Sequence, residues 1–312
     1  MAINKSASFI TDFSTDKRPF GFYLTGSLVI ILFSFLGQAP MFLFFSAETS
    51  SSSNPFNYFS HLDSNLTLLL FLIPSLIAFF GFLFVIKYIH KQSLQSVTTA
   101  RKQIDVKRMI FGFGFWGILS VLIFGASLIF SPEHYRWNFE LQPFLTMLII
   151  ASLLIPFQSA LEEWIFRGYL MQGFATMTRS RLLSLMLTSI IFGSLHILNP
   201  EIDKLGYGLM AYYIGSGLFF GIVALMDEGI ELAIGIHVAN NLITAILVTA
   251  DWTAFQTASL YKDISTPNLI VELSLSLLLF YPLSILIFFR KYHWKNWKEK
   301  LIAPIDGEKA QL

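Results

Sequence analysis

The chain has 312 residues, of which 54% are hydrophobic and only 13% are charged, and 33 of the residues are Phe. A water-soluble protein of this size needs a polar surface, so this composition predicts a membrane protein. The net charge of +1 argues against a nucleic-acid partner, and the lack of Cys excludes disulfides, thiolate catalysis and Cys-ligated zinc.

Apolar segments follow one another along the chain, separated by short polar segments. A helix needs about 20 apolar residues to cross roughly 30 Å of hydrocarbon. The expected spans are 19–47, 66–86, 109–132, 141–161, 182–198, 205–226, 232–250 and 273–289. We therefore expect an all-α fold, a polytopic transmembrane bundle of about eight helices with a buried polar catalytic cavity, in a single integral membrane domain over 1–312.

Lys and Arg residues are divided unevenly between the two sides that these spans define. When the N-terminus is placed inside, the four inside segments hold three, six, three and six basic residues, or 18 of the total of 21. The outside loops hold Arg136, Lys204 and Lys262. Because cytoplasmic loops carry the excess of Lys and Arg, we expect both termini to be cytoplasmic.

Three further features have structural explanations. The polar segment 48–65 is expected to be a mobile outer loop. Gly217 and Gly221 form a Gly-xxx-Gly face on the sixth span, which predicts close packing against a neighbouring helix. Trp294 and Trp297 lie beside the last lysines and are typical of an anchor at the membrane interface.

Two adjacent carboxylates and an arginine follow the fourth span directly, in Leu161-Glu-Glu-Trp-Ile-Phe-Arg167. Ionisable side chains are costly inside a membrane and usually have a function there. Glu163 and Arg167 are four residues apart and could simply neutralise each other near the membrane surface. Glu162 points roughly 100° away from Glu163 around a helix, so one Arg cannot satisfy both carboxylates. We therefore predict that Glu162 is a general base acting on water and that Arg167 holds Glu163 in support.

Two further motifs place polar side chains on membrane spans. Phe192 and His196 lie one helical turn apart on the fifth span, and His237 and Asn241 lie one turn apart on the seventh. A single His of this kind is more often a hydrogen-bonded packing residue than a catalytic group. Two polar groups on one face are harder to explain by packing, so we predict that His237 and Asn241 donate hydrogen bonds to a developing negative oxygen.

The spacing of the motifs indicates that they can meet. If the fourth and fifth helices form an antiparallel hairpin that turns near 178–181, Glu162 and His196 each lie about 15 residues from the turn, or roughly 23 Å along each arm. His237 lies only about 9 Å inside its span, so the turn must project beyond the cytoplasmic face by about 14 Å. We therefore predict a partly submerged cavity that opens toward the cytoplasm.

The three motifs together resemble the family of CAAX prenyl proteases and bacteriocin-processing enzymes (CPBP), intramembrane peptidases that include the type II CAAX endopeptidase and the Abi proteins. The family's Glu-Glu-x-x-x-Arg fits Glu162, Glu163 and Arg167, its Phe-x-x-x-His fits Phe192 and His196, and its His-x-x-x-Asn fits His237 and Asn241. The motifs occur in the family's order, and the resemblance covers 141–248, which we expect to be the catalytic core.

The resemblance implies an intramembrane endopeptidase that acts in CAAX-type or bacteriocin/leader-type processing. In such an enzyme the glutamate and the first His activate water, while the second His and the Asn stabilise the oxyanion. The expected partners are membrane lipid and a membrane-associated or lipidated peptide or protein, and the expected location is the bacterial cell (inner) membrane. The acidic segment 227–231 leaves the choice of substrate open.

Other functions remain open for the same residues. Glu162, His196 and His237 could bind Zn²⁺ and form a metalloprotease, although no His-Glu-x-x-His helix is present. We favour a peptidase that requires no cofactor. A transporter or a non-catalytic, immunity-type membrane scaffold could also hold polar residues in a helical bundle, but the chain has no convincing internal repeat of the kind that transporters contain.

Overall fold

A computed structural model describes residues 9–10, 19–44 and 62–305 of the chain. The expected outer loop lies outside the described residues from 48 to 61. The described chain forms a polytopic helical bundle with little sheet, which confirms the predicted polytopic helical bundle. The elements are α1 (Gly21–Gly37), α2 (Ser64–Phe84), α3 (Val106–Phe130), β1 (Tyr135–Trp137), α4 (Leu141–Glu163), α5 (Met171–Thr178), α6 (Arg181–Ser194), α7 (Pro200–Leu205), α8 (Met210–Asp227), α9 (Glu231–Leu247), β2 (Val248–Ala250), β3 (Tyr261–Asp263), α10 (Leu269–Leu273), α11 (Tyr281–Lys291) and α12 (Trp297–Leu301).

Short 3-10 and π-helical segments extend several of these helices. The 3-10 segments are Ala39–Phe44, Pro132–His134 and Tyr207–Leu209, and the π-helical segments are Val85–Ile89, Trp164–Leu170 and Ser274–Phe280. Among the described residues, six helical runs are long and apolar enough to cross a membrane, and α6 and α9 are shorter apolar helices. These eight helical segments correspond one to one to the eight expected spans, and the chain is an integral membrane protein.

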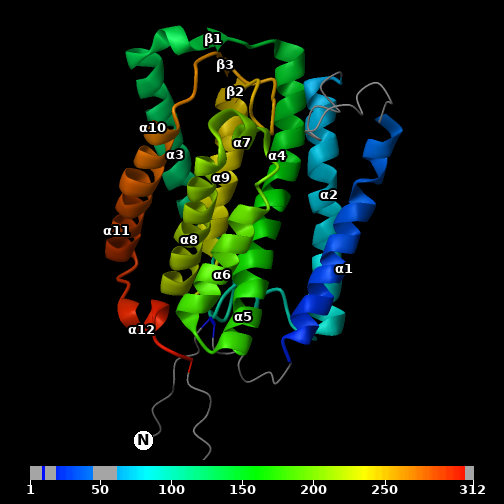
Figure 1. Ribbon diagram of the computed structural model, residues 1–312, viewed down its shortest axis with the longest axis vertical. Coiled ribbons are helices and arrows are strands. Elements are labelled where there is room, and N and C mark those ends of the chain that lie inside the picture. The colour runs from blue at the N-terminus through cyan, green and yellow to red at the C-terminus, as the bar shows by residue number, and fades with distance from the viewer. Residues whose placement is uncertain (1–8, 11–18, 45–61, 306–312) are drawn as a thin grey trace, which may run out of the picture.

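The helices lie side by side along one long axis (Figure 1). A three-stranded sheet of order β1-β3-β2 lies at one end of the bundle, with β1 antiparallel and β2 parallel to β3. In this sheet Arg136 pairs with Lys262, so two of the basic residues expected outside lie together. At the opposite end α12 carries Lys298 and Lys300. Basic residues expected outside and basic residues expected inside therefore lie at opposite ends of the bundle, and the orientation of these ends stays a prediction.

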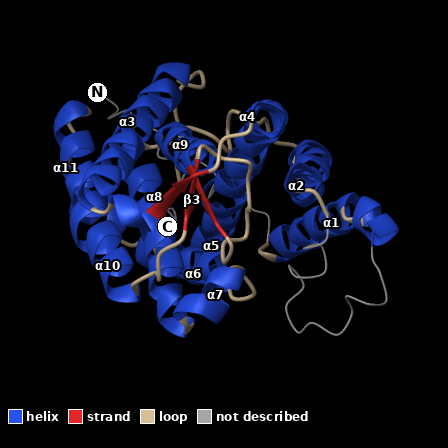
Figure 2. Ribbon diagram, turned by 90° about the horizontal axis from the view of Figure 1, so that it is seen from above, coloured by secondary structure: helices blue, strands red, loops and turns tan. Residues whose placement is uncertain are grey.

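Helix α9 lies near the centre of the bundle, where α3, α4 and α8 pack around it (Figure 2). Its Leu232 and Ile236 are fully buried. Large apolar side chains are exposed on the outer faces of other helices, for example Leu28 at 67% and Leu122 at 64%. This arrangement suits a surface that faces hydrocarbon and an interior that can hold polar groups.

Helix α4 continues through the π-helical segment Trp164–Leu170 into α5, giving one run of 38 residues. At a rise of about 1.5 Å per residue this run is about 57 Å long, well beyond the roughly 30 Å of a bilayer core. It ends where Arg179 adopts a left-handed conformation (φ 52°), and the Ser180 side chain then caps α6 by accepting a hydrogen bond from Leu183 N at 3.2 Å. The predicted hairpin turn is therefore confirmed.

Helix α6 is shorter than the expected span 182–198. It ends at Ser194, and residues 195–198 form a turn before Asn199 and the start of α7 at Pro200. Proline favours an extended conformation in the residue before it, and Asn199 is extended here (ψ 142°), so the chain breaks between α6 and α7. His196 therefore lies in the turn beyond the helix, and its predicted position on the fifth helix was wrong.

Candidate functional site

The two adjacent glutamates lie in different surroundings. The Glu163 side chain is fully buried, whereas the Glu162 side chain is 26% exposed. Both stand at the end of α4, immediately before the π-helical segment Trp164–Leu170. Segments of this kind occur frequently at functional sites, because an extra residue in the turn redirects the side chains around it. One carboxylate is thus enclosed by protein and the other is accessible.

The enclosed carboxylate of Glu163 has two cationic or polarisable partners. Arg167 Nη1 donates to Glu163 Oε1 at 2.9 Å, and His237 Nδ1 is 2.7 Å from the same oxygen. Arg167 is only 1% exposed. The pairing of Glu163 with Arg167 that the four-residue spacing predicts is therefore present, and it lies in the interior of the bundle.

The rest of the Arg167 guanidinium is held by α8 and by aromatic rings. Its Nη2 donates to the carbonyl oxygen of Gly217 at 3.2 Å, and its Cζ lies 4.4 Å from the centre of the Phe192 ring. Gly217 is required here because a Cβ at this position would lie 2.8 Å from Ser189 Cα on α6. The predicted close packing at Gly217 is confirmed.

His237 lies between the two glutamates. With Nδ1 directed at Glu163, its Nε2 faces Glu162 Oε2 at 3.8 Å. The ring stacks on Phe220, with centroids 4.9 Å apart, which fixes its plane. A separation of 3.8 Å is too long for a direct hydrogen bond, and one water molecule can contact both atoms at this spacing.

His196 is oriented from both sides. Its Nδ1 donates to the carbonyl oxygen of Phe192 at 2.8 Å, so the neutral ring carries no proton on Nε2. The ring stacks on Tyr213 with centroids 4.4 Å apart, and it lies within electrostatic reach of Glu162 and His237. His196 therefore lies beside the Phe192 ring, at a centroid distance of 4.9 Å, and the same ring lies 6.4 Å from that of His237.

Asn241 contacts the glutamate helix through a residue that the motifs do not include. Its Nδ2 donates to Gln158 Oε1 at 3.2 Å and to Ser159 Oγ at 3.1 Å, and Gln158 Nε2 donates to Glu162 Oε1. Sequence reasoning missed Gln158. The available signal was its position four residues before Glu162, on the same face of an otherwise apolar helix.

The acidic segment 227–231 lies away from this set and has a structural role. Asp227 is 4% exposed and forms ion pairs with Arg101 at 3.0 Å and with Arg108. Glu231 pairs with the same Arg101 at 3.0 Å. These bonds join α3 and the loop before it to the junction of α8 and α9.

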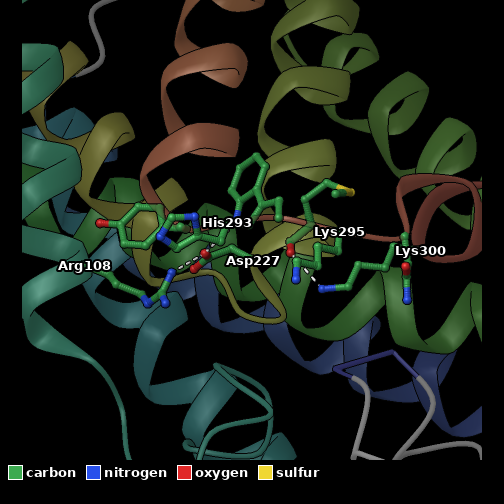
Figure 3. Close-up of a pocket in the computed structure, with 9 residues that line it drawn as sticks. Arg108, Asp227, His293, Lys295 and Lys300 are labelled. Carbon is green, nitrogen blue, oxygen red and sulfur yellow. Dashed lines mark hydrogen bonds and ion pairs between the residues drawn. The ribbon is translucent and has the colours of Figure 1, made fainter.

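A pocket of about 250 Å³ lies beside Asp227, at the end of the bundle where α11 and α12 meet (Figure 3). Trp294 lines it and donates to Asp227 Oδ1 at 3.0 Å. Trp294 is 5% exposed, so its predicted role as an interfacial anchor was wrong, whereas Trp297 is 48% exposed and fits that role. None of the residues that line this pocket belongs to the Glu162 set.

The three expected zinc ligands are Glu162, His196 and His237. The described residues include no group of three His, Cys, Asp or Glu side chains placed to hold a metal ion. Of the three expected zinc ligands, His237 directs Nδ1 at Glu163, and Glu162 Oε1 already accepts from Gln158. These contacts use neither His237 Nε2 nor Glu162 Oε2, so the zinc site stays the alternative prediction.

The part of the chain that contains the site also matches a known protein family. Residues 141–243 match the family described as Type II CAAX prenyl endopeptidase Rce1-like. The family resemblance is confirmed over this segment. The Rce1-like segment runs from the start of α4 into α9 and contains all six predicted site residues, while α1 to α3 and α10 to α12 lie outside it.

A curated relative matches a longer stretch. The chain is 28% identical over 193 residues to the uncharacterized protein YyaK of Bacillus subtilis (strain 168). This alignment covers 62% of the chain and 61% of the length of that relative. No solved structure gives a significant match.

Proposed function

We propose that this chain is an intramembrane endopeptidase of the CAAX type in which Glu162 activates a water molecule. The observation that carries the proposal is the pair of atoms Glu162 Oε2 on α4 and His237 Nε2 on α9, which lie 3.8 Å apart. A partly exposed carboxylate beside an imidazole can hold water and accept its proton. The match of residues 141–243 to the Rce1-like family supports the same class of reaction.

The reaction would proceed by direct attack of water on a peptide carbonyl. Glu162 takes one proton, the new hydroxide bonds to the carbonyl carbon, and the carbonyl oxygen becomes an oxyanion. His237 and Asn241 are the proposed donors to this oxyanion. His237 would donate through Nε2 when that atom is protonated, and Asn241 would donate by releasing the N–H that it gives to Ser159 Oγ, while its bond to Gln158 stays in place. The proton on Glu162 then passes to the amide nitrogen, and the carbon–nitrogen bond breaks as the oxyanion re-forms the carbonyl. The products are an amine and a carboxylic acid, which gives its proton to water or to the amine.

Glu163 and Arg167 take no proton in this scheme. Their buried pair fixes the His237 ring through the 2.7 Å contact at Nδ1, which aims Nε2 at the reacting water. His196 is proposed to assist Glu162, since its neutral ring can accept a proton at Nε2. The substrates would be membrane-associated or lipidated peptides, and no step is assigned to a metal ion.

The experiment is cleavage of an internally quenched peptide library, with each peptide made with and without a C-terminal farnesylated CAAX end. We expect the purified protein to cleave at least one peptide and to retain full turnover after exhaustive treatment with a chelator. Loss of turnover that added Zn²⁺ restores would favour the metalloprotease. If no peptide of the library is cleaved, the result would favour the immunity-type scaffold.

A further inference from the structure

A chain of side-chain hydrogen bonds crosses three helices and ends on Glu162. The Trp116 indole N–H on α3 donates to Asn240 Oδ1 at 3.1 Å, and Asn240 Nδ2 donates to Asn241 Oδ1 at 3.0 Å. Asn241 Nδ2 donates to Gln158 Oε1 at 3.2 Å, and Gln158 Nε2 donates to Glu162 Oε1. The chain thus links α3, α9 and α4 to the proposed base.

The first and last groups of this series of hydrogen bonds determine which atom donates and which accepts in every bond of the series. An indole N–H can only donate, and an ionised carboxylate can only accept. Each amide between them accepts through its oxygen and donates through its nitrogen, so an amide that turned over would lose both bonds. Ser159 supports the same direction, because its hydroxyl accepts from Asn241 Nδ2 at 3.1 Å and donates to Gln158 Oε1 at 3.1 Å.

Gln158 is the member of the chain that contacts Glu162. It lies one helical turn earlier on α4, so the two side chains share a face of that helix. The terminal torsion of a glutamate is broad when nothing restrains it, and Glu162 is 26% exposed. By binding Oε1, Gln158 removes this freedom and leaves Oε2 as the oxygen that faces His237 Nε2.

We propose that Gln158 is a positioning residue that holds Glu162 in its reactive orientation through the hydrogen-bond chain from Trp116. The inference rests on the proposed function of Glu162 as the base. Gln158 does not touch the reacting atoms. It acts by deciding which carboxylate oxygen meets the water, and Asn240 and Asn241 fix its amide so that the nitrogen is the end presented to Glu162.

The test is the variant Gln158→Met, assayed on a peptide that the wild type cleaves. Methionine nearly keeps the shape of glutamine and removes both hydrogen bonds. We expect kcat to fall about 10-fold to 100-fold while KM stays within about twofold, as for other losses of orientation around a reacting group. Gln142→Met is the matched control, because Gln142 lies exposed on the same helix, and it should keep wild-type kcat.

A double variant separates positioning from a general structural effect. In the Glu162→Gln background there is no base left to orient, so adding Gln158→Met should cause no further loss of turnover. A further loss of similar size in that background would overturn the inference. Wild-type kcat in Gln158→Met would also overturn it, whereas wild-type kcat in Glu162→Gln would instead overturn the proposed function.

Gln158→Glu separates the bonds that Gln158 accepts from the bond that it donates to Glu162. It also serves as the test if the methionine variant does not fold. An ionised glutamate can still accept from Asn241 and Ser159, but it cannot donate to Glu162 and places a second negative charge beside it. We expect kcat to fall at least as far as in Gln158→Met. Wild-type kcat in Gln158→Glu would show that Gln158 serves Asn241 and not Glu162, which contradicts the proposal.

Discussion

Arg167 is the residue on which the buried part of the site depends most. It is 1% exposed, forms an ion pair with the equally buried Glu163, and donates to the backbone of Gly217. The partner of Arg167 could be predicted from the sequence because a spacing of four residues puts two side chains on one helical face. The contact between His237 Nδ1 and Glu163 could not, because it depends on how α9 packs against α4.

Replacing Arg167 with alanine should therefore reduce stability as well as activity. The change leaves the Glu163 carboxylate buried without its cationic partner, which typically costs about 3 kcal/mol or more. We expect a lower thermal midpoint and less folded protein in detergent than for Arg290→Ala, which removes an exposed arginine at the end of α11. Equal folded yields and equal midpoints for the two variants would contradict the structural role of the buried pair.

At the scale of the elements, the packing of α6 against α8 determines where His196 lies. Gly217 permits the approach because a Cβ there would meet the backbone of Ser189 on α6. The Gly-xxx-Gly spacing made a close approach predictable, and the eight apolar segments made the helices predictable. The end of α6 at Ser194 was not predicted, because the apolar sequence continues to Leu198 and only Pro200 indicates the turn.

Gly217→Ala tests this packing directly. The added methyl group must push α6 and α8 apart or shift Ser189, and overpacking of this kind typically costs about 1 to 3 kcal/mol. Gly114→Ala on α3 is the matched control, because nothing lies within 4 Å of a Cβ built there. In thermal unfolding we expect a lower midpoint for Gly217→Ala and an unchanged or slightly higher one for Gly114→Ala, since alanine favours helix. The reverse order would refute the close approach.

At the scale of the whole molecule, the bundle has the small sheet at one end and α12 at the other (Figure 1), and α12 carries Lys298 and Lys300. The distribution of Lys and Arg predicts that the sheet end is outside and that both termini are cytoplasmic. The acidic segment 227–231 forms ion pairs at the end with α12. Glu228 binds Lys300 Nζ at 3.2 Å, and Asp227 binds Arg101 and Arg108. The sequence could predict the two ends, but not these long-range ion pairs.

The orientation can be measured with single cysteines, because the natural chain contains none. Thr266 and Ser93 are both exposed, Thr266 follows β3, and Ser93 lies between α2 and α3. In intact cells an impermeant thiol reagent should label Thr266→Cys and leave Ser93→Cys unlabelled until the cells are broken open. Labelling of Ser93→Cys alone in intact cells would reverse the orientation.

The central claim is that Glu162 is the base, and the most direct measurement is the kcat of Glu162→Gln on a peptide that the wild type cleaves. Glutamine keeps the size of the side chain and can still bind a substrate, but it cannot take a proton from water. We expect kcat to fall by about 10² to 10⁴ while the thermal midpoint and KM stay close to wild type. Glu133→Gln, whose side chain is 70% exposed, is the control and should keep full turnover. Wild-type kcat in Glu162→Gln would contradict the account.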